Sequence, residues 1–390
     1  MKLIYCICAL YNPGGMERVL LNKVTYLVEK LHWDITVVTT DQKKRPPFYS
    51  FPKDVNMVDL GINYSDDNSK PVFQKITGYL RRRRTHKRRL TALLQKEKAD
   101  IVISLYPSES SFIPSIQDGS KKVLELHYNK FFRLQYNRNG FLGLIDQWRT
   151  SQDERIVRKF DRFVVLTYED RGYWRYLPNM EVIPNAALSL GKTYYDVSCK
   201  RIIAVGRLDY QKGFDRLIQA WELVLRNKAF KEWHLDIFGQ GEWKTLLQKM
   251  IDEKGLQTNT HINPPTKDIV AEYTQSSILV MSSNYEGFPM VMIEAMACGL
   301  PVVSFDYKCG PKDIIKDGEN GLLVANGDIH GLADTMIDVM GDDNFRKMLS
   351  ENEEVTANQS GSACFHFHRT YHAGDWRTGH AERLGKLHRL

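Results

Sequence analysis

The chain alternates short apolar runs with longer segments in which apolar residues recur at helical spacing. Buried parallel strands produce such continuous runs, and the helices that cross between them carry one apolar stripe. The alternation therefore predicts an α/β protein built on doubly wound parallel sheets. The predicted strands span residues 3–10, 35–39, 101–105, 123–126 and 163–166 in the first half, and 201–205, 234–238, 278–281, 301–305 and 321–324 in the second.

A turn-rich segment over residues 182–200 separates the two halves. We expect two Rossmann-like domains, over 1–192 and 193–352, which face each other across a cleft at the carboxyl ends of their strands, where open α/β sheets bind ligands. Residues 353–390 hold five of the eleven histidines and no apolar stripe. We expect this atypical tail to be disordered, and its histidines lack the carboxylate or cysteine partners of a metal site.

The composition excludes several classes of protein. Of the 390 residues, 43% are apolar and 26% are charged, as in ordinary soluble globular proteins. No window approaches the roughly 18 to 20 apolar residues of a spanning helix, and the apolar start is too short for a secretion signal. The six cysteines show no CxxC spacing. We therefore expect reduced thiols in a cytosolic protein, with neither disulfides nor structural zinc.

A dense run of cations lies in the first half, where residues 81–89 read RRRRTHKRR. Like charges this close seldom serve fold stability, so the run is typical of an exposed surface that binds the phosphates of lipid or nucleic acid. The net charge of +7 agrees with a mild attraction to anionic surfaces. A solvated helix face is the plain alternative. The candidate membrane-binding residues are Arg81, Arg82, Arg83, Arg84, Lys87, Arg88 and Arg89.

In each half of the chain, a glycine-containing loop follows the first predicted strand. Gly14 and Gly15 precede a helix, where free backbone N–H groups at the positive end of the helix dipole favour a phosphate. The loop matches neither GxGxxG nor a GK[ST] phosphate loop, and a tight turn is its alternative. In the second half, Arg207 and Lys212 lie on a turn that Gly206 and Gly213 flank. These two cations can converge on a diphosphate, whereas ordinary surface charge is the alternative.

The segment NYEGFPMVMIEAMACGLPVVSFD places two carboxylates near one predicted helix start. Pro289 suits the first turn of that helix, so Glu286 precedes it and Glu294 lies inside it, with seven residues between them. A carboxylate there can accept hydrogen bonds from ribose hydroxyls, and the backbone N–H groups around Gly287 and Phe288 can bind phosphate or sugar oxygens.

Together these segments resemble the retaining glycosyltransferases of the GT-B fold, specifically family GT4. The resemblance rests on four elements in order: G-G-x-E-R at 14–18, V-I-P-N at 182–185, G-R-L-x-x-x-K-G at 206–213 and E-x7-E at 286–294. It covers roughly residues 1–350. It implies an acceptor-binding first domain and a second domain that binds the nucleotide sugar.

The resemblance also implies roles for individual residues. In the family, the residue matching Glu294 holds the nucleotide ribose, those matching Arg207 and Lys212 neutralise the leaving diphosphate, and that matching Glu286 lies near the transferred sugar. His127, in LELHYN after a predicted strand, matches a histidine close to the sugar and the acceptor. The implied catalytic residues are His127, Glu286, Arg207 and Lys212. The implied donor-binding residues are Gly14, Gly15, Gly206, Arg207, Lys212, Gly287, Phe288 and Glu294.

The implied reaction moves a hexose or N-acetylhexosamine from a nucleotide-diphosphate sugar, in the first place a UDP-sugar, with retention of configuration. The implied acceptor is a glycan or a polyprenyl-diphosphate-linked glycan of bacterial surface polysaccharide synthesis. The chain contains no D-x-D triplet, so we expect no metal and no other cofactor. We expect a cytoplasmic protein whose basic run attaches it to the anionic inner face of the cell membrane.

Three alternatives remain at this stage. Family members usually end in a helix that braces the first domain, and residues 353–390 do not resemble it, which favours a catalytically weak or inactive member. The second alternative is a soluble sugar synthase that acts on a non-lipid acceptor. In such a protein the basic run would not bind a membrane. A nucleic-acid-binding protein is the remote alternative, because the run has no interleaved aromatic residues and no recognition-helix pattern.

Overall fold

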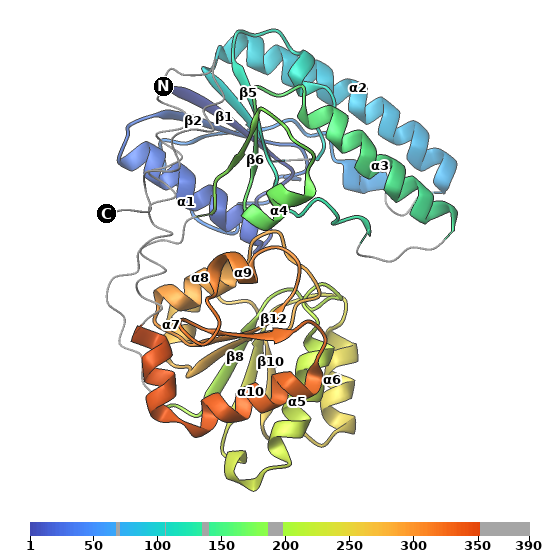
Figure 1. Cartoon of the computed structure of the whole chain (residues 1–390). Coiled ribbons are helices and arrows are strands. Elements are labelled where there is room, and N and C mark those ends of the chain that lie inside the picture. Colours follow the sequence, from blue (N-terminus) through green and yellow to red (C-terminus); the bar gives the residue numbers. More distant parts are fainter. Residues whose placement is uncertain (68–70, 106, 135–139, 186–197, 352–390) are drawn as a thin grey trace.

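A computed structural model of the chain describes residues 1–67, 71–105, 107–134, 140–185 and 198–351, which form two lobes, each built on one parallel sheet (Figure 1). The first lobe comprises β1 (Lys2–Ile7), α1 (Gly15–Glu29), β2 (Asp34–Thr39), β3 (Asn56–Asp59), η1 (Tyr64–Asp67), α2 (Val72–Glu97), β4 (Ile101–Ser104), η2 (Ile113–Ser115), β5 (Lys121–Glu125), α3 (Phe141–Val157), β6 (Arg162–Val165), α4 (Tyr168–Tyr173) and β7 (Met180–Val182). The second comprises β8 (Arg201–Val205), α5 (Phe214–Leu225), η4 (Lys228–Phe230), β9 (His234–Phe238), α6 (Lys244–Glu253), β10 (Thr260–Asn263), α7 (Ile269–Thr274), β11 (Ile278–Met281), α8 (Met290–Ala297), β12 (Val302–Asp306), α9 (Pro311–Ile314), β13 (Leu322–Ala325) and α10 (Ile329–Gly341).

Both sheets have the doubly wound strand order that the sequence predicts. The first runs β3-β2-β1-β4-β5-β6-β7 and the second runs β10-β9-β8-β11-β12-β13. Neighbouring strands within them pair in parallel, for example Leu3 with Ile35 and Ile202 with Leu235. In each sheet the order reverses beside its first strand, β1 or β8, and ligands bind open α/β sheets at such a reversal. The fold class predicted from the sequence is confirmed.

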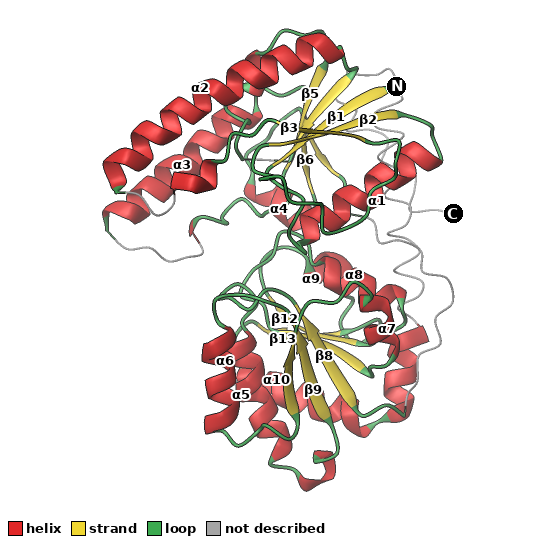
Figure 2. Cartoon of the chain, turned by 180° about the vertical axis from the view of Figure 1, so that it is seen from behind, coloured by secondary structure: helices red, strands yellow, loops and turns green. Residues whose placement is uncertain are grey.

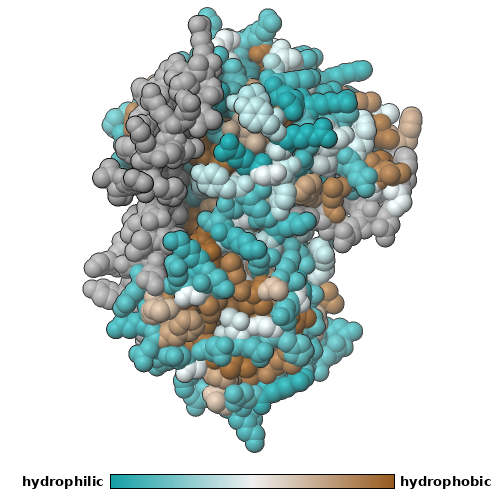
Figure 3. Space-filling view, in the orientation of Figure 1, coloured by the Kyte–Doolittle hydropathy of each residue, from teal (hydrophilic) through white to brown (hydrophobic). Residues whose placement is uncertain are grey.

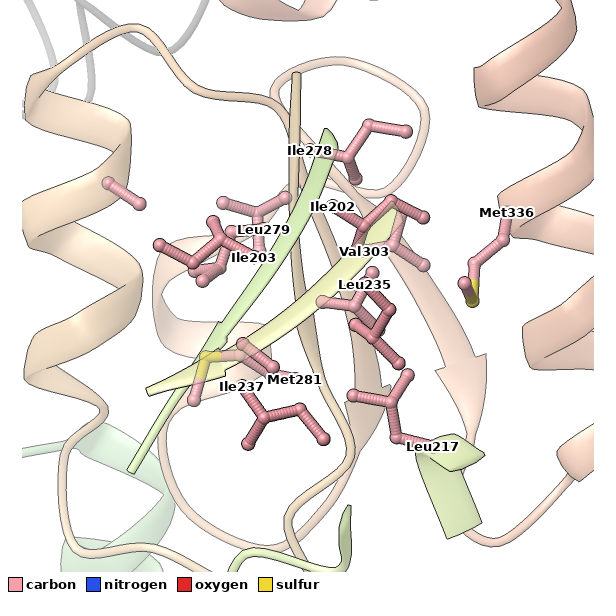
Figure 4. Close-up of a cluster of buried hydrophobic side chains, with 14 of the residues drawn as sticks. Ile202, Ile203, Leu217, Leu235, Ile237, Ile278, Leu279, Met281, Val303 and Met336 are labelled. Atoms are coloured by element: carbon pink, nitrogen blue, oxygen red, sulfur yellow. The ribbon is translucent and has the colours of Figure 1, made fainter. Parts of the chain in front are cut away.

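Apolar side chains cover both faces of each sheet. In the second lobe, Ile202, Leu235 and Val303 point toward Met336 of α10, whereas Ile203 points to the opposite side of the sheet (Figure 4). Successive strand residues alternate between faces, so a strand that is apolar at every position is buried on both. This two-sided core fixes the carboxyl ends of the strands, from which the site residues project.

The two lobes meet at helices and loops that lie between the sheets, with α1 and α4 on one side and α8 and α9 on the other (Figures 1 and 2). Asp313 of α9 accepts hydrogen bonds from the backbone N–H groups of Tyr168 and Glu169 at 3.0 and 3.4 Å, so the second lobe caps a helix of the first. Glu169 in turn accepts one from the N–H of Cys309 at 2.8 Å. These contacts place the carboxyl ends of the two sheets face to face.

Some predictions need correction or lie outside the described residues. The sequence reading missed β3, β7 and β10, and β1 ends at Ile7 rather than at residue 10. The domain boundary near residue 192 and the tail over 353–390 lie outside the described residues. The five described cysteines, at 6, 8, 199, 298 and 309, form no disulfide with one another. Among the described helices, none combines the length and the apolar character that crossing a bilayer requires.

Candidate functional site

Glu286 lies in the loop between β11 and α8, where three side chains bind its buried carboxylate. The ammonium of Lys212 donates to its Oε1 at 2.6 Å, and the hydroxyl of Ser283 donates to the same oxygen at 2.9 Å. The amide of Gln211 donates to Oε2 at 2.9 Å. Because buried carboxylates require such partners, Glu286 is held in one orientation.

Two glycines, Gly206 and Gly213, shape the backbone around Lys212 so that its side chain can reach Glu286. A Cβ added at Gly206 would lie 2.7 Å from Cε of Lys212, so the lysine side chain packs directly over that glycine. Gly213 has φ +59° and directly precedes α5, and a Cβ there would lie 2.3 Å from the backbone oxygen of Ser282. The position of Gly213 therefore requires glycine, because both its positive φ and the nearby backbone oxygen exclude a Cβ, whereas Gly206 leaves the space that the Lys212 side chain occupies on its way to Glu286.

Arg207 belongs to the same network but stands at its edge. Its guanidinium donates to Oε1 of Gln211 at 2.5 Å and lies 3.4 Å from Asp209, while 62% of its side chain stays exposed. The chain of contacts runs from Arg207 through Gln211 to Glu286. The structure thus brings together the three charged residues that the sequence predicted for the diphosphate and the sugar, and it adds Gln211, which no sequence motif indicated.

Glu294 lies on α8, and Arg18 of α1 reaches it from the other lobe. Nε of Arg18 is 4.0 Å from Oε1 of Glu294, and the guanidinium of Arg18 also lies over the ring of Tyr49 with 5.2 Å to its centroid. Burial raises the pKa of Glu294 to about 7, while the charges of Arg18 and Lys212 lower it. Glu294 is thus a half-buried carboxylate at the lobe interface, available to hydroxyl donors.

The first turn of α1 carries Gly14 and Gly15, as predicted, but Glu17 covers it. A Cβ added at Gly14 would lie 2.2 Å from Oε2 of Glu17, so that carboxylate folds back over the glycine. Burial raises the pKa of Glu17 to about 7, although a hydrogen bond from its own backbone N–H and the charge of Arg207 both act to lower this pKa. Gly15 faces the second lobe, since a Cβ there would lie 3.8 Å from Cγ of Met290. Sequence reasoning missed Glu17 as a site residue, although it lies within G-G-x-E-R.

His127 follows β5 and lies against the loop that carries Glu286. A Cβ added at Gly287 would lie 2.2 Å from the carbonyl oxygen of His127, so the two loops touch backbone to backbone. Beside this contact, the buried amide of Asn129 donates to the backbone oxygen of Glu286 at 2.8 Å. The adjacent Phe288 is partly buried against the core of the second lobe. The structure therefore places His127 and the Glu286 loop at one point of the lobe interface.

The basic run forms part of α2 and divides into two sets. Arg82 donates to the backbone oxygen of Ile62, Arg83 donates to Ser111 at 3.1 Å, and Arg89 donates to the backbone oxygen of Leu60, so these three bind the lobe itself. The other four cations are exposed on the helix: Arg81, Arg84, Lys87 and Arg88. The seven predicted membrane-binding residues thus do not form a single surface.

A polar groove of about 670 Å³ opens beside β9 and β10, lined in part by Arg201, Asp236 and Glu272. None of the sequence-predicted site residues lines it. Within the described ranges, no group of three or more His, Cys, Asp or Glu side chains is arranged to hold a metal ion. The candidate site is therefore the lobe interface and not this groove, because the interface gathers the charged residues with buried partners.

Comparisons with known proteins identify the family. Residues 13–187 match the family described as Glycosyltransferase Family 4, and residues 196–355 match Glycosyl transferases group 1. The amylovoran biosynthesis glycosyltransferase AmsD of Erwinia amylovora is 29% identical over 335 residues, which cover 81% of this chain and 84% of AmsD. The GalNAc-alpha-(1->4)-GalNAc-alpha-(1->3)-diNAcBac-PP-undecaprenol alpha-1,4-N-acetyl-D-galactosaminyltransferase of Campylobacter jejuni is 24% identical over 357 residues, which cover 90% of this chain and 92% of that protein.

A solved structure shows the same architecture. A variant of S. aureus TarM, crystallised with Fondaparinux, alpha-GlcNAc-glycerol and UDP, superposes with a TM-score of 0.78 at 17% identity, over 95% of this chain and 99% of TarM. Its likeness supports the fold, and the two family matches divide the chain much as the two lobes do. The chain belongs to the GT4-type glycosyltransferases, and its two facing Rossmann-like lobes form the GT-B fold.

Proposed function

We propose that this glycosyltransferase moves a hexose or N-acetylhexosamine from a UDP-sugar to a glycan or polyprenyl-diphosphate-linked acceptor in bacterial surface polysaccharide synthesis, with retention of configuration. The observation that carries the proposal is the network in which Arg207, Gln211 and Lys212 converge on Glu286 next to His127. Cations beside a carboxylate at the carboxyl ends of strands suit a sugar joined to a diphosphate.

The donor is assigned to the second lobe. Glu294 accepts hydrogen bonds from the ribose hydroxyls, while Arg207 and Lys212 lie on the diphosphate and Glu286 lies beside the sugar. Lys212 is paired with Glu286 at 2.6 Å, so a bound diphosphate shares or displaces that contact. Gly14, Gly15, Gly287 and Phe288 contribute backbone N–H groups around the phosphates and the sugar. The N–H of Gly206 donates to the backbone oxygen of Phe238 at 3.0 Å, so this glycine instead leaves room for Lys212 beside the diphosphate.

The chemical step breaks the bond between the anomeric carbon and the leaving phosphate oxygen and forms one from that carbon to the acceptor oxygen. We propose front-side attack, in which the acceptor hydroxyl passes its proton to the departing diphosphate. Negative charge then develops on the diphosphate, and the protein's main task is to stabilise it. Arg207 and Lys212 supply the positive charge that offsets it, so we propose that the reaction needs neither a metal nor another cofactor.

The relatives support the choice of donor and acceptor. The name of the Campylobacter protein specifies an undecaprenol-linked glycan, that of AmsD specifies amylovoran biosynthesis, and the TarM crystal contained UDP. The first lobe of this chain then receives a glycan acceptor, with His127 between acceptor and donor sugar. A lipid-linked acceptor also requires the protein to reach a bilayer.

For that contact we propose the outer surface of α2. Its exposed cations Arg81, Arg84, Lys87 and Arg88 share one side of the helix with exposed apolar residues near its start, of which Phe73 is 77% exposed. Leu144 and Trp148 of α3 are also exposed, and both helices extend together from the first lobe (Figures 1 and 2). Hydrophobic side chains gather at that outer end (Figure 3). Cations beside apolar side chains suit the inner, anionic face of the cell membrane.

The test is a thermal-shift panel of nucleotide sugars with the wild type and Glu294→Ala. We expect one UDP-sugar to raise the melting temperature of the wild type more than other nucleotide sugars do, and the shift to shrink in the variant. Glu253→Ala, at an exposed position of α6, is the control and should respond as the wild type does. If no UDP-sugar stabilises the wild type, the proposed donor is wrong.

A further inference from the structure

A buried row of three side chains lies behind the proposed sugar site. The ammonium of Lys23, on α1, donates to Oε2 of Glu125 at 2.7 Å, and Nε2 of His127 lies 3.3 Å from the same oxygen. All three are enclosed, with side chains exposed by 9%, 0% and 5%. Such a row costs desolvation, so its presence beside the site calls for a role beyond stability.

Glu125 is an anion in this row. Burial alone would raise its pKa, but the charge of Lys23 and the contact with His127 bring the pKa of Glu125 down to about 2. An ionised carboxylate can only accept hydrogen bonds, so the imidazole nitrogen that faces it must carry the proton. That nitrogen is Nε2 of His127.

His127 is neutral in the same setting. Burial is the main cause that lowers its pKa, and the positive charge of Lys23 lowers it further, while Glu125 opposes both. The second lobe contributes the backbone of Gly287 to the wall beside His127, and that backbone carries no charge. A neutral imidazole holds one proton, and with Nε2 protonated its Nδ1 presents a lone pair.

We propose that Lys23 and Glu125 are positioning residues, which hold His127 as the neutral Nε2–H tautomer so that its Nδ1 accepts a hydrogen bond from a hydroxyl of the donor sugar or acceptor. The inference rests on the proposed function for the identity of that hydroxyl. It gives His127 the role of an acceptor and not of a general acid. The buried ion pair would then act on the substrate only through His127. Carboxylates that hydrogen-bond to metal-bound histidines fix the tautomer and orientation of the ring in the same way.

The experiment is long-range ¹H–¹⁵N correlation NMR of the full chain labelled at histidine nitrogens, with His127 assigned by its absence in His127→Gln. At neutral pH we expect the wild type to show Nε2 protonated and Nδ1 unprotonated. The double variant Lys23→Met/Glu125→Gln keeps the side-chain lengths and leaves no buried charge unpaired. Its glutamine can donate as well as accept, so we expect the tautomers of His127 to mix.

Activity gives the second measurement. The double variant should bind UDP, which lacks the sugar, within twofold of the wild type, while its turnover falls about tenfold, as expected for the loss of one hydrogen bond. Arg162→Met/Glu181→Gln removes an ion pair of 2.8 Å elsewhere in the first sheet and is the control, with tautomer and turnover unchanged.

A wild-type His127 protonated on Nδ1 or on both nitrogens would overturn the proposal, and so would a double variant with an unchanged tautomer. The NMR measurement needs no substrate. If no nucleotide sugar binds the wild type, the proposed function fails while the tautomer result still decides the positioning role.

Discussion

The side-chain amide of Asn129 in the first lobe donates to the backbone oxygen of Glu286 in the second at 2.8 Å. Lys212 and Gln211, from the second lobe itself, hold the carboxylate of the same residue. Glu286 is therefore fixed from both lobes at once. The contact makes the position of this carboxylate depend on how closely the lobes approach.

Gly287→Ala tests that dependence. A Cβ at this position would lie 2.2 Å from the carbonyl oxygen of His127, so the two loops must separate. We expect turnover to fall by more than about tenfold, because a displacement of catalytic groups by even 1 Å greatly slows the reaction. Steady-state kinetics on any accepted donor measures the loss.

Gly172→Ala is the matched control, since a Cβ there meets nothing within 4 Å. It should keep wild-type turnover. Full activity in Gly287→Ala would contradict the close contact between the loops.

Arg207→Ala and Lys212→Ala should differ, although both side chains are assigned to the diphosphate. Both should lower turnover more than donor affinity, if their contacts strengthen as charge develops. Arg207 is 62% exposed, so its loss should leave the melting temperature unchanged. The loss of Lys212 leaves Glu286 buried without its cation and should cost ~3 kcal/mol of folding free energy. Calorimetry and kinetics on both variants check this, and equal melting temperatures would speak against the buried pair.

Donor binding should depend on pH through Glu294. Its pKa is raised to about 7 in the ligand-free protein, and its ionised form is the stronger acceptor for ribose hydroxyls. As pH rises toward 7 the ionised fraction grows, so affinity should rise up to about pH 7 and level off above about pH 8, and binding should release protons over the range in which the affinity rises. Glu294→Ala should weaken binding by about 1.5 to 3 kcal/mol and abolish the rise.

Glu17 shares a pKa of about 7 but has the opposite effect, because its ionised form repels the diphosphate. Glu17→Gln should therefore steepen the rise of affinity with pH. Titration calorimetry in two buffers of different ionisation enthalpy separates the effects. Because the effects of Glu17 and Glu294 oppose each other in the wild type, the decisive profile is that of Glu17→Gln: an affinity of this variant that stays flat over this range would remove Glu294 from the ribose site.

Vesicle binding should follow the two sets of cations on α2. Replacing Arg81, Arg84, Lys87 and Arg88 by Ser should weaken binding to anionic vesicles by at least ~100-fold at low salt, since each cation contributes about 1 kcal/mol near such a surface. High salt should release much of the wild type, while the apolar side chains retain a part. Co-sedimentation measures both.

Arg82→Gln with Arg89→Gln is the control for charge. These side chains bind backbone oxygens of Ile62 and Leu60, so the variant should lose stability and change vesicle binding less than the outward set does. Equal losses from both sets would show a response to net charge alone.

The sequence predicted ten strands and the two-lobe plan because most of these strands carry apolar runs that are buried on both faces of the sheet. It missed β3, β7 and β10 for one physical reason. All three lie at the edges of their sheets, are three or four residues long and carry polar or exposed residues, so they produce no apolar run. Only pairing with a neighbour identifies them as strands.

The candidate site was predictable where its residues share a motif, as Arg207 and Lys212 do. Glu125 and Lys23 were not, because they are 102 positions apart and nothing local in either segment indicates the other. The basic run shows the same limit. The sequence of the run does not reveal that Arg82, Arg83 and Arg89 donate hydrogen bonds to the lobe, since that depends on which face of α2 packs against it.

The central claim is metal-independent transfer from a UDP-sugar with retention. It is tested most directly by ¹H NMR of the anomeric proton in the first product formed, with the accepted α-linked UDP-sugar and excess EDTA present. We expect the product to appear at the rate seen without EDTA and to carry the α-anomeric configuration of the donor. A β-linked product, or a reaction that stops when EDTA is added, would contradict it.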